Sequence, residues 1–169
     1  GASTITQQLI KNSLLSTERT YTRKIKEIIL SLWAESIYSK EQILSMYLNN
    51  APYGGTSWGV EAASQSYFGK SARKLTLGQA AYLAGLPASP SEYSPYGTMP
   101  ELGIVRQKDV LQKMVENKYI SKQQAEEARG GELNIKPQLV DIQAPHFVMY
   151  TKSYLEQKYG PVAVAQGVL

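Results

Sequence analysis

Apolar residues recur every three or four positions along most of this chain, which is the spacing of amphipathic helices. The pattern predicts helices over 22–37, 40–49, 59–68, 76–86, 99–118, 121–129 and 144–159. No long alternation of β-branched residues appears, and only 133–142 is a candidate for extended chain. The Gly-, Pro- and Tyr-rich stretches 50–58 and 87–98 are expected to be ordered loops. The sequence therefore predicts a mainly α fold with short connections.

Helix start signals support this assignment. A hydroxyl residue followed three positions later by Gln or Glu is the pattern of a capping box. It occurs at Thr4/Gln7, Ser39/Gln42, Thr76/Gln79, Thr98/Glu101 and Ser121/Gln124. Pro100 fits the first turn of a helix, and Gly130 and Gly160 fit helix ends.

The helix expected at 22–37 has two distinct faces. Its apolar stripe should face the core; the members of the stripe are Ile25, Ile28, Ile29, Leu32 and Ser36. Arg23 and Glu27 lie one turn apart on the opposite face, which other protein or a ligand would line. A solvated pair at this spacing stabilises a helix by only about 0.3–0.5 kcal/mol, so stability alone is a weak reason for it. The alternative interpretation is that Arg23 and Glu27 form an ordinary ion pair on the solvated helix surface, without a functional role.

The first 27 residues hold an ordered set of polar side chains. Hydroxyl and amide groups come first, cations follow, and a carboxylate ends the series: Ser3, Gln7, Gln8, Lys11, Arg19, Arg23, Lys24 and Glu27. The chain carries a net charge of +4, and residues 1–40 contribute +3 of it, from six basic and three acidic side chains. Both observations favour an anionic, sugar-bearing partner near the N-terminal third. No nucleic-acid partner is expected.

Other features exclude several classes of site. The 169 residues form one domain, 1–169, that is large enough for a hydrophobic core. There is no cysteine, so a disulfide framework and a thiolate metal site are both excluded. Asp109 and Asp141 are the only aspartates, and no D-x-D motif holds a metal on a nucleotide-sugar diphosphate. No apolar run approaches the roughly 18 residues that span a bilayer.

Four ordered motifs lie along the chain: G-x-S-T-I-T-Q-Q at 1–8, R-K-x-x-E at 23–27, K-x-x-I-L-x-x-Y-L-N at 40–49 and R-R-x-x-V-L-x-x-M at 106–114. Together they resemble the family 51 glycosyltransferases, the peptidoglycan-polymerising domain of class A penicillin-binding proteins. The last motif departs from the pattern, because Gln107 stands where the family has its second Arg. The family's first motif, E-D-x-x-F-x-x-H-x-G, is not matched and is expected upstream of Gly1.

The resemblance implies a lysozyme-like helical domain that lacks its N-terminal part and polymerises lipid II into glycan strands, releasing undecaprenyl pyrophosphate. Glu27 corresponds to the family's second essential carboxylate. Lys11, Arg19 and Arg23 would bind the pyrophosphate, and Ser3, Gln7 and Gln8 would bind sugar or phosphate oxygens. Lys24 is a further substrate-binding candidate. The family's general base belongs to the first motif, so the fragment alone is expected to be inactive.

The remaining expectations concern scaffold, cofactors and partners. The motif at 40–49 is expected to be scaffold, because one face of its helix is apolar: Ile43, Leu44, Tyr47 and Leu48. Asn49 is likewise expected to be structural, and Arg106 to brace the site. Tyr53 and Trp58 are candidates either for sugar stacking or for the core, and His146 is more often structural than catalytic at such a position. No cofactor is required, although Mg²⁺ or Mn²⁺ from solution could sit at the pyrophosphate. The expected partners are lipid II, the growing glycan, the membrane surface and other cell-wall synthesis proteins, at the extracytoplasmic face. A linker to a transpeptidase domain is expected to begin near 160–169.

Two other functions fit parts of this pattern. A lysozyme-like hydrolase also places a Glu in a helical cleft, but it has no pyrophosphate for the cation series to bind. A non-catalytic helical module that binds lipid II or a partner would use the same cations without turnover. If the cations bind a pyrophosphate, a phosphoglycolipid inhibitor such as moenomycin is also expected to bind them.

Overall fold

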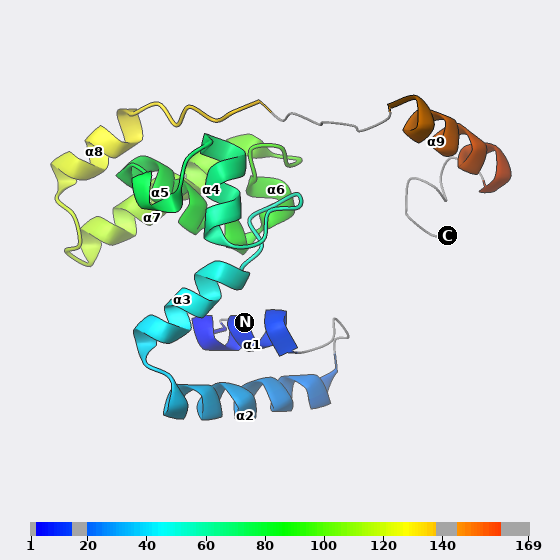
Figure 1. Ribbon diagram of the computed structural model, residues 1–169. Coiled ribbons are helices and arrows are strands. Elements are labelled where there is room, and N and C mark those ends of the chain that lie inside the picture. Colours follow the sequence, from blue (N-terminus) through cyan, green and yellow to red (C-terminus); the bar gives the residue numbers. More distant parts are fainter. Residues whose placement is uncertain (1–2, 15–19, 138–144, 160–169) are drawn as a thin grey trace. The chain divides into compact units, whose positions relative to one another are not determined.

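The computed structural model describes residues 3–14, 20–137 and 145–159, which are helical without a β-strand (Figure 1). The helices are α1 (Ile5–Leu14), α2 (Tyr21–Ile37), α3 (Lys40–Asn50), α4 (Val60–Phe68), α5 (Leu77–Gly85), α6 (Pro90–Tyr93), α7 (Pro100–Glu116), α8 (Lys122–Gly130) and α9 (Pro145–Tyr159). Two short 3₁₀ turns, η1 (Ala72–Lys74) and η2 (Leu86–Ala88), complete the set. The mainly α prediction is confirmed.

The chain divides into two compact units, Gly1–Pro137 and Gln138–Leu169. The first unit holds α1 to α8, and the second holds α9. Within the described residues, no helix is long and apolar enough to cross a bilayer. Residues 133–137 are neither helix nor strand, and the rest of the candidate extended segment lies outside the described residues. The end of the chain at 160–169 also lies outside them.

Most of the predicted helix starts are confirmed by side-chain caps. Complete capping boxes open α3 at Ser39, α5 at Thr76 and α8 at Ser121. The signal at Thr98 is wrong, because Met99 occupies the cap of α7 without a side-chain hydrogen bond. Pro100 takes the first helical position there, where its missing N–H costs no hydrogen bond.

Two parts of the predicted secondary structure need correction. The signal at Thr4/Gln7 opens a further helix, α1, that the assigned segments did not include. The stretch 87–98 was expected to be a loop, yet it begins within η2 and contains α6. Four-residue helices leave almost no periodicity in a sequence, so the Gly and Pro content dominated the prediction.

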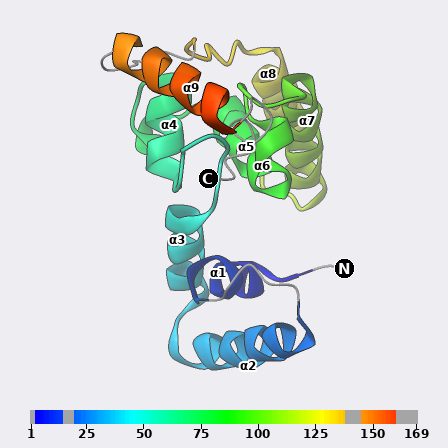
Figure 2. The same ribbon diagram turned by 90° about the vertical axis from the view of Figure 1, so that its right-hand side faces the viewer.

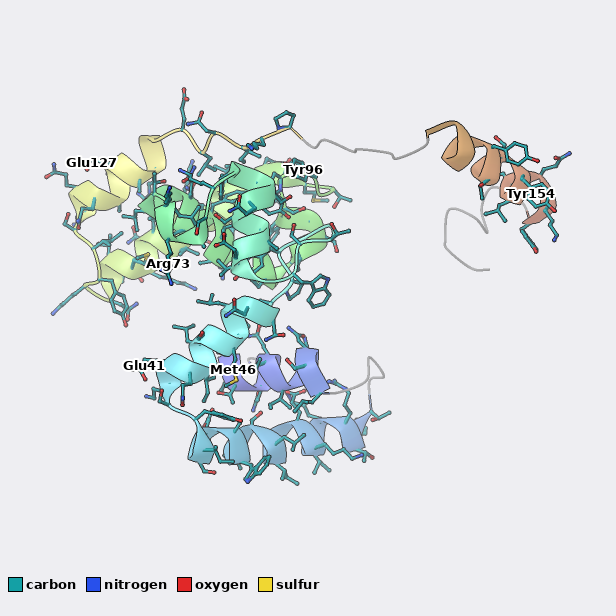
Figure 3. All side chains as sticks on the ribbon, viewed as in Figure 1. Glu41, Met46, Arg73, Tyr96, Glu127 and Tyr154 are labelled. Atoms are coloured by element: carbon teal, nitrogen blue, oxygen red, sulfur yellow. The ribbon has the colours of Figure 1, made fainter. Side chains whose placement is uncertain are left out.

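The first three helices pack together: α1 contacts both α2 and α3, and Figure 2 shows α1 alongside α2. The prediction that the aliphatic stripe of α2 faces the core is wrong. Ile25, Ile29 and Leu32 are 59%, 60% and 65% exposed, whereas the buried residues of α2 are Glu27, Ser31 and Ala34. Figure 3 draws side chains on the outer face of α2 that point away from α1. Periodicity identifies residues that share a face, but it does not say which face packs.

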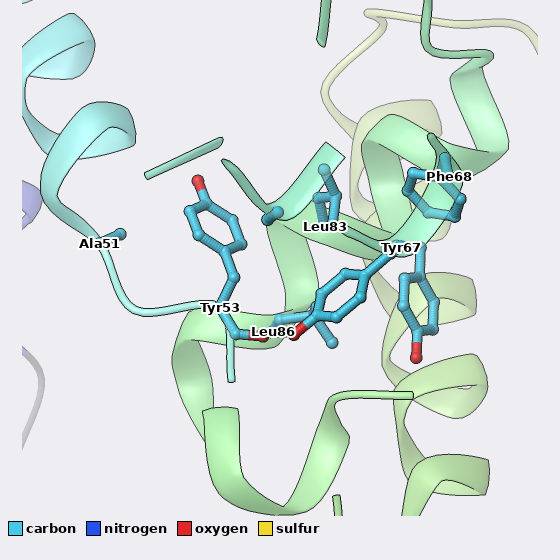
Figure 4. Packing of buried hydrophobic residues seen from close by; sticks show 8 residues of the cluster. Ala51, Tyr53, Tyr67, Phe68, Leu83 and Leu86 are labelled. Atoms are coloured by element: carbon cyan, nitrogen blue, oxygen red, sulfur yellow. Dashed lines mark hydrogen bonds between the residues drawn. The ribbon is translucent and has the colours of Figure 1, made fainter. Parts of the chain in front are cut away.

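The main hydrophobic cluster is built by α4, α5 and the loop before α4 (Figure 4). Its buried members are Ala51, Tyr53, Ala63, Tyr67, Phe68, Tyr82, Leu83 and Leu86. The Tyr67 hydroxyl donates to the carbonyl oxygens of Tyr53, at 2.8 Å, and Gly54, at 3.1 Å. Tyr53 therefore belongs to the core, while Trp58, in the same loop, is 60% exposed.

A second cluster joins α5, α7 and α8 through Ala81, Leu111 and Ala125. Gln107 is buried beside it and donates its side-chain N–H to the carbonyl oxygen of Gly78, at 2.8 Å. This contact explains why a neutral amide is suitable where the family pattern has an Arg. A buried guanidinium at this point would require its own counter-charge.

Candidate active site

The N-terminal turn of α1 presents the first group of predicted site residues. Thr4 and Gln7 exchange side-chain-to-backbone hydrogen bonds of 3.1 and 3.3 Å, so the expected capping pair forms. Gln7 and Gln8 are half-buried in the first turn, and Ser3 is exposed just before it. The capping role of Gln7 and a ligand-binding role are both compatible with this geometry.

A buried carboxylate on α2 is the most unusual feature of the site. Glu27 is 2% exposed, although α2 carries it in the middle of a surface helix. Arg23 Nη1 lies 3.3 Å from Glu27 Oε2, and the Lys24 ammonium pairs with Glu27 Oε1. Burial of a carboxylate costs free energy unless the charge is paired, and here each Glu27 oxygen is paired with a cationic side chain.

The two cations that pair with Glu27 extend toward solvent. The Arg23 side chain is 18% exposed and that of Lys24 is 43% exposed. They line an open cavity of about 420 Å³ together with Thr20 and Tyr21. The Thr20 hydroxyl caps α2 by accepting from the Arg23 backbone N–H at 3.1 Å. Guanidinium and ammonium N–H groups at the edge of an opening can bind an anionic ligand.

The structure brings α1 and α2 together at these residues. The Lys24 ammonium donates to the Ser3 hydroxyl at 3.4 Å, and Gln8 Nε2 donates to the Ser3 carbonyl oxygen at the same distance. Ser3, Gln8, Lys24, Arg23 and Glu27 thus form one connected polar cluster, the site cluster. Motifs that are separated in the sequence meet because α1 packs along α2.

Other predicted residues lie apart from these contacts. Lys11 is exposed in the last turn of α1, and Arg19 lies outside the described residues. The exposed Asn49 donates its side-chain amide to Ser45 of its own helix at 2.9 Å. His146 belongs to α9, but its side chain is not among those described.

Arg106 lies on α7, where its stem packs against Gly85 of α5. A Cβ atom at Gly85 would lie 2.7 Å from Arg106 Cγ. The guanidinium lies 3.6 Å from Asp109 and lines a cavity of about 280 Å³ with Tyr93 and Leu102. This arrangement joins α5 to α7, and bracing of the site stays a prediction.

Sequence reasoning missed Tyr47 as a partner of the site. It was treated as scaffold on the apolar face of α3, yet its hydroxyl donates to Gln8 Oε1 at 3.4 Å. Sequence periodicity contains no signal for this contact, because the residues are separated by 39 positions. The other residues of that apolar face are not all buried: Ile43 is buried, whereas Leu44 is 45% exposed.

Comparison with known proteins defines the class to which this fold and site belong. The family described as Transglycosylase matches residues 1–115, so the chain belongs to the transglycosylase family. This agrees with the resemblance seen in the four motifs.

The relatives with similar sequences are penicillin-binding proteins. The chain is 44% identical to penicillin-binding protein 1A of Aquifex aeolicus, over 96% of this chain and 22% of that protein. It is 43% identical to penicillin-binding protein 1A of Neisseria lactamica, over 99% of this chain and 21% of that protein.

A solved structure shows the same relationship. The crystal structure of penicillin-binding protein 1A from Haemophilus influenzae aligns with a TM-score of 0.54 at 27% identity. The alignment covers 94% of this chain and 20% of that one, so the chain spans about a fifth of the length of the relatives that it matches.

Proposed function

We propose that this chain contributes the pyrophosphate-binding side of a peptidoglycan glycosyltransferase that polymerises lipid II. The observation that carries the proposal is the buried Glu27 carboxylate, held between Arg23 and Lys24 and linked to Ser3. A neutral glycosidic substrate gives such cations no ligand, whereas a sugar pyrophosphate does. The similarity to penicillin-binding proteins over almost the whole chain supports the same substrate class.

In this proposal the acceptor's 4-hydroxyl attacks C1 of the donor sugar, and the bond from C1 to the pyrophosphate oxygen breaks. Negative charge develops on the leaving pyrophosphate, where Arg23 and Lys24 offer charge-assisted hydrogen bonds. Glu27 orients both cations toward that oxygen. Lys11 and Arg19 would bind the same group, and Ser3, Gln7 and Gln8 its sugar or phosphate oxygens. The proton of the attacking hydroxyl passes to the general base of the family's first motif, which residues 1–169 do not match.

The residues around Glu27 do not suit a resident metal ion. Both carboxylate oxygens face cationic side chains, which would repel Mg²⁺ or Mn²⁺. Within the described part of the chain, no group of three or more His, Cys, Asp or Glu side chains could hold a metal.

A lipid-linked substrate places the reaction at a membrane surface. We propose the extracytoplasmic face of the bacterial membrane, where the growing glycan and other cell-wall synthesis proteins would be the partners.

The test is an assay of the longest natural form of the protein with lipid II, following glycan strands and released undecaprenyl pyrophosphate. We expect polymerisation that moenomycin inhibits. Cleavage of finished glycan without polymerisation would instead identify a lysozyme-like hydrolase. Tight lipid II binding without either reaction would identify a non-catalytic binding module.

A further inference from the structure

Tyr47 connects the hydrophobic core with the site cluster. Its ring packs, partly buried, against the cluster that contains Tyr53 and Tyr67. Its hydroxyl reaches in the other direction and donates to Gln8 Oε1 on α1, at 3.4 Å. Burial raises the pKa of Tyr47, so the hydroxyl stays protonated and able to donate at neutral pH.

The side-chain amide of Gln8 is held at both ends. Its oxygen accepts from Tyr47, and its nitrogen donates to the Ser3 carbonyl oxygen at 3.4 Å. A flipped amide would bring two carbonyl oxygens together at Ser3, because Gln8 Oε1 would then face the Ser3 oxygen. The Ser3 carbonyl therefore sets the orientation of this amide, and in that orientation the Tyr47 hydroxyl is the donor to Gln8 Oε1.

Ser3 continues the series of contacts to the charged residues. Its hydroxyl accepts from the Lys24 ammonium at 3.4 Å, and Lys24 pairs with the buried Glu27. Hydrogen bonds and one ion pair thus lead from α3 through α1 to α2. Because Ser3 precedes the first turn of α1, the intrahelical hydrogen bonds of that helix do not fix its position.

We propose that Tyr47 is a positioning residue for this site, acting through Gln8 to hold Ser3 where it meets Lys24 and the phosphate group of a ligand. The inference rests on the proposed function and adds a residue to it. Tyr47 itself does not touch the ligand. Its contribution is to reduce the number of arrangements that Gln8 and Ser3 adopt before binding.

Binding of moenomycin to the 169-residue chain, measured by calorimetric titration, tests this role. Tyr47→Phe removes one hydroxyl and keeps the ring in the core. We expect it to weaken binding about three- to tenfold, the effect of one neutral hydrogen bond. Tyr53→Phe is the matched control, since its hydroxyl lies 3.5 Å from the Leu48 carbonyl oxygen and outside the site cluster. It should leave the affinity unchanged.

The double variant separates positioning from general loosening of the fold. If Tyr47 acts through Gln8, then Tyr47→Phe should cost no further affinity in a protein that already carries Gln8→Ala. Losses that add fully would contradict the proposal. Equal affinities for the Tyr47→Phe variant and the wild type would also overturn it.

A measurement without ligand distinguishes this inference from the proposed function. The side-chain amide signals of Gln8 in the nuclear magnetic resonance spectrum should move in Tyr47→Phe and stay in place in Tyr53→Phe. If these signals move but the wild-type chain binds no moenomycin, the contact stands and the proposed function fails. If they stay in place in Tyr47→Phe, the positioning role is wrong whatever the chain binds.

Discussion

Glu27 lies inside the protein while its partner Arg23, one helical turn away, extends from it to the surface. The distance between Arg23 Nη1 and Glu27 Oε2 is 3.3 Å, and the two side chains are 18% and 2% exposed. The carboxylate is therefore shielded from solvent, whereas the cations that pair with it reach the surface. The pair is thus not a solvated surface contact, and its role in ligand binding stays a prediction.

Replacement of Glu27 by Gln should remove both ion pairs and leave Arg23 and Lys24 without a counter-charge. We expect the free energy of unfolding to fall by about 1–2 kcal/mol, less than for a fully buried pair because the cations reach water. The helical pattern alone, which places Glu27 away from the apolar stripe, would suggest only about 0.5 kcal/mol. Chemical denaturation measures the difference, and lipid II turnover should be lost as well.

Glu35→Gln is the control for that change, because Glu35 is an exposed carboxylate on the same helix. It should alter the free energy of unfolding by no more than about 0.5 kcal/mol. Near-normal turnover in Glu27→Gln would remove Glu27 from the mechanism.

Arg23→Ala should weaken moenomycin binding about ten- to a hundredfold, since it deletes a charge-assisted hydrogen bond at the edge of the opening. Arg23→Lys should restore only part of the affinity, because an ammonium lacks the planar guanidinium fork. Lys122→Ala on α8 is the matched control, since Lys122 is exposed and does not belong to the site cluster. If the Arg23 and Lys122 variants bind equally well, this basic stretch is ordinary surface.

Gln107→Leu should destabilise the fold by about 0.5–1.5 kcal/mol, because it removes the buried hydrogen bond that Gln107 donates to the Gly78 carbonyl oxygen. Gln123→Leu is the control on α8, where the amide is exposed and donates to Glu127 at 2.9 Å. Thermal unfolding of both variants checks the difference. A similar melting temperature for the two would show that the Gln107 contact does not stabilise the fold.

Two adjacent glycines should respond differently to substitution by Ala. Gly54 has φ +104°, and a Cβ atom there would lie 2.3 Å from Ser94 Cβ. Gly55 has φ +55° with no atom within 4 Å of the new Cβ. We expect Gly54→Ala to cost about 3 kcal/mol or more, and Gly55→Ala about 1 kcal/mol from its left-handed backbone alone. Denaturation curves of the two variants measure this contrast, and equal costs would contradict the packing around Gly54.

Alkaline pH should destabilise the protein through its core tyrosines. Burial raises the pKa of Tyr53 and of Tyr82 above the usual value of 10.0. In the unfolded chain these phenols ionise near pH 10, whereas in the folded chain they stay neutral, so stability is complete below that pH and falls as the pH rises above it. Denaturation midpoints measured from neutral to strongly alkaline pH check the sign. Tyr82→Phe should make the decline shallower.

Local sequence signals predicted most helices to within two residues of their ends. Three of the five capping pairs close as complete boxes, and Thr4/Gln7 forms both of its hydrogen bonds. These signals succeed because a cap depends on atoms that are three residues apart. Thr98 failed because a proline two residues later fixes the helix start independently of the hydroxyl.

The sequence by itself determined the helical class and the family, since these depend on residue type and local spacing. It also singled out Ser3, Gln8, Arg23, Lys24 and Glu27, which the structure brings into contact. Only the tertiary structure decided which face of α2 is buried, that Tyr53 packs in the core while Trp58 is exposed, and that Tyr47 reaches Gln8. The periodicity of the sequence separates the two faces of α2, but it does not show which face α1 covers. Small residues such as Ser31 and Ala34 let another helix approach, so the face with Glu27 was covered and the more apolar face was left exposed.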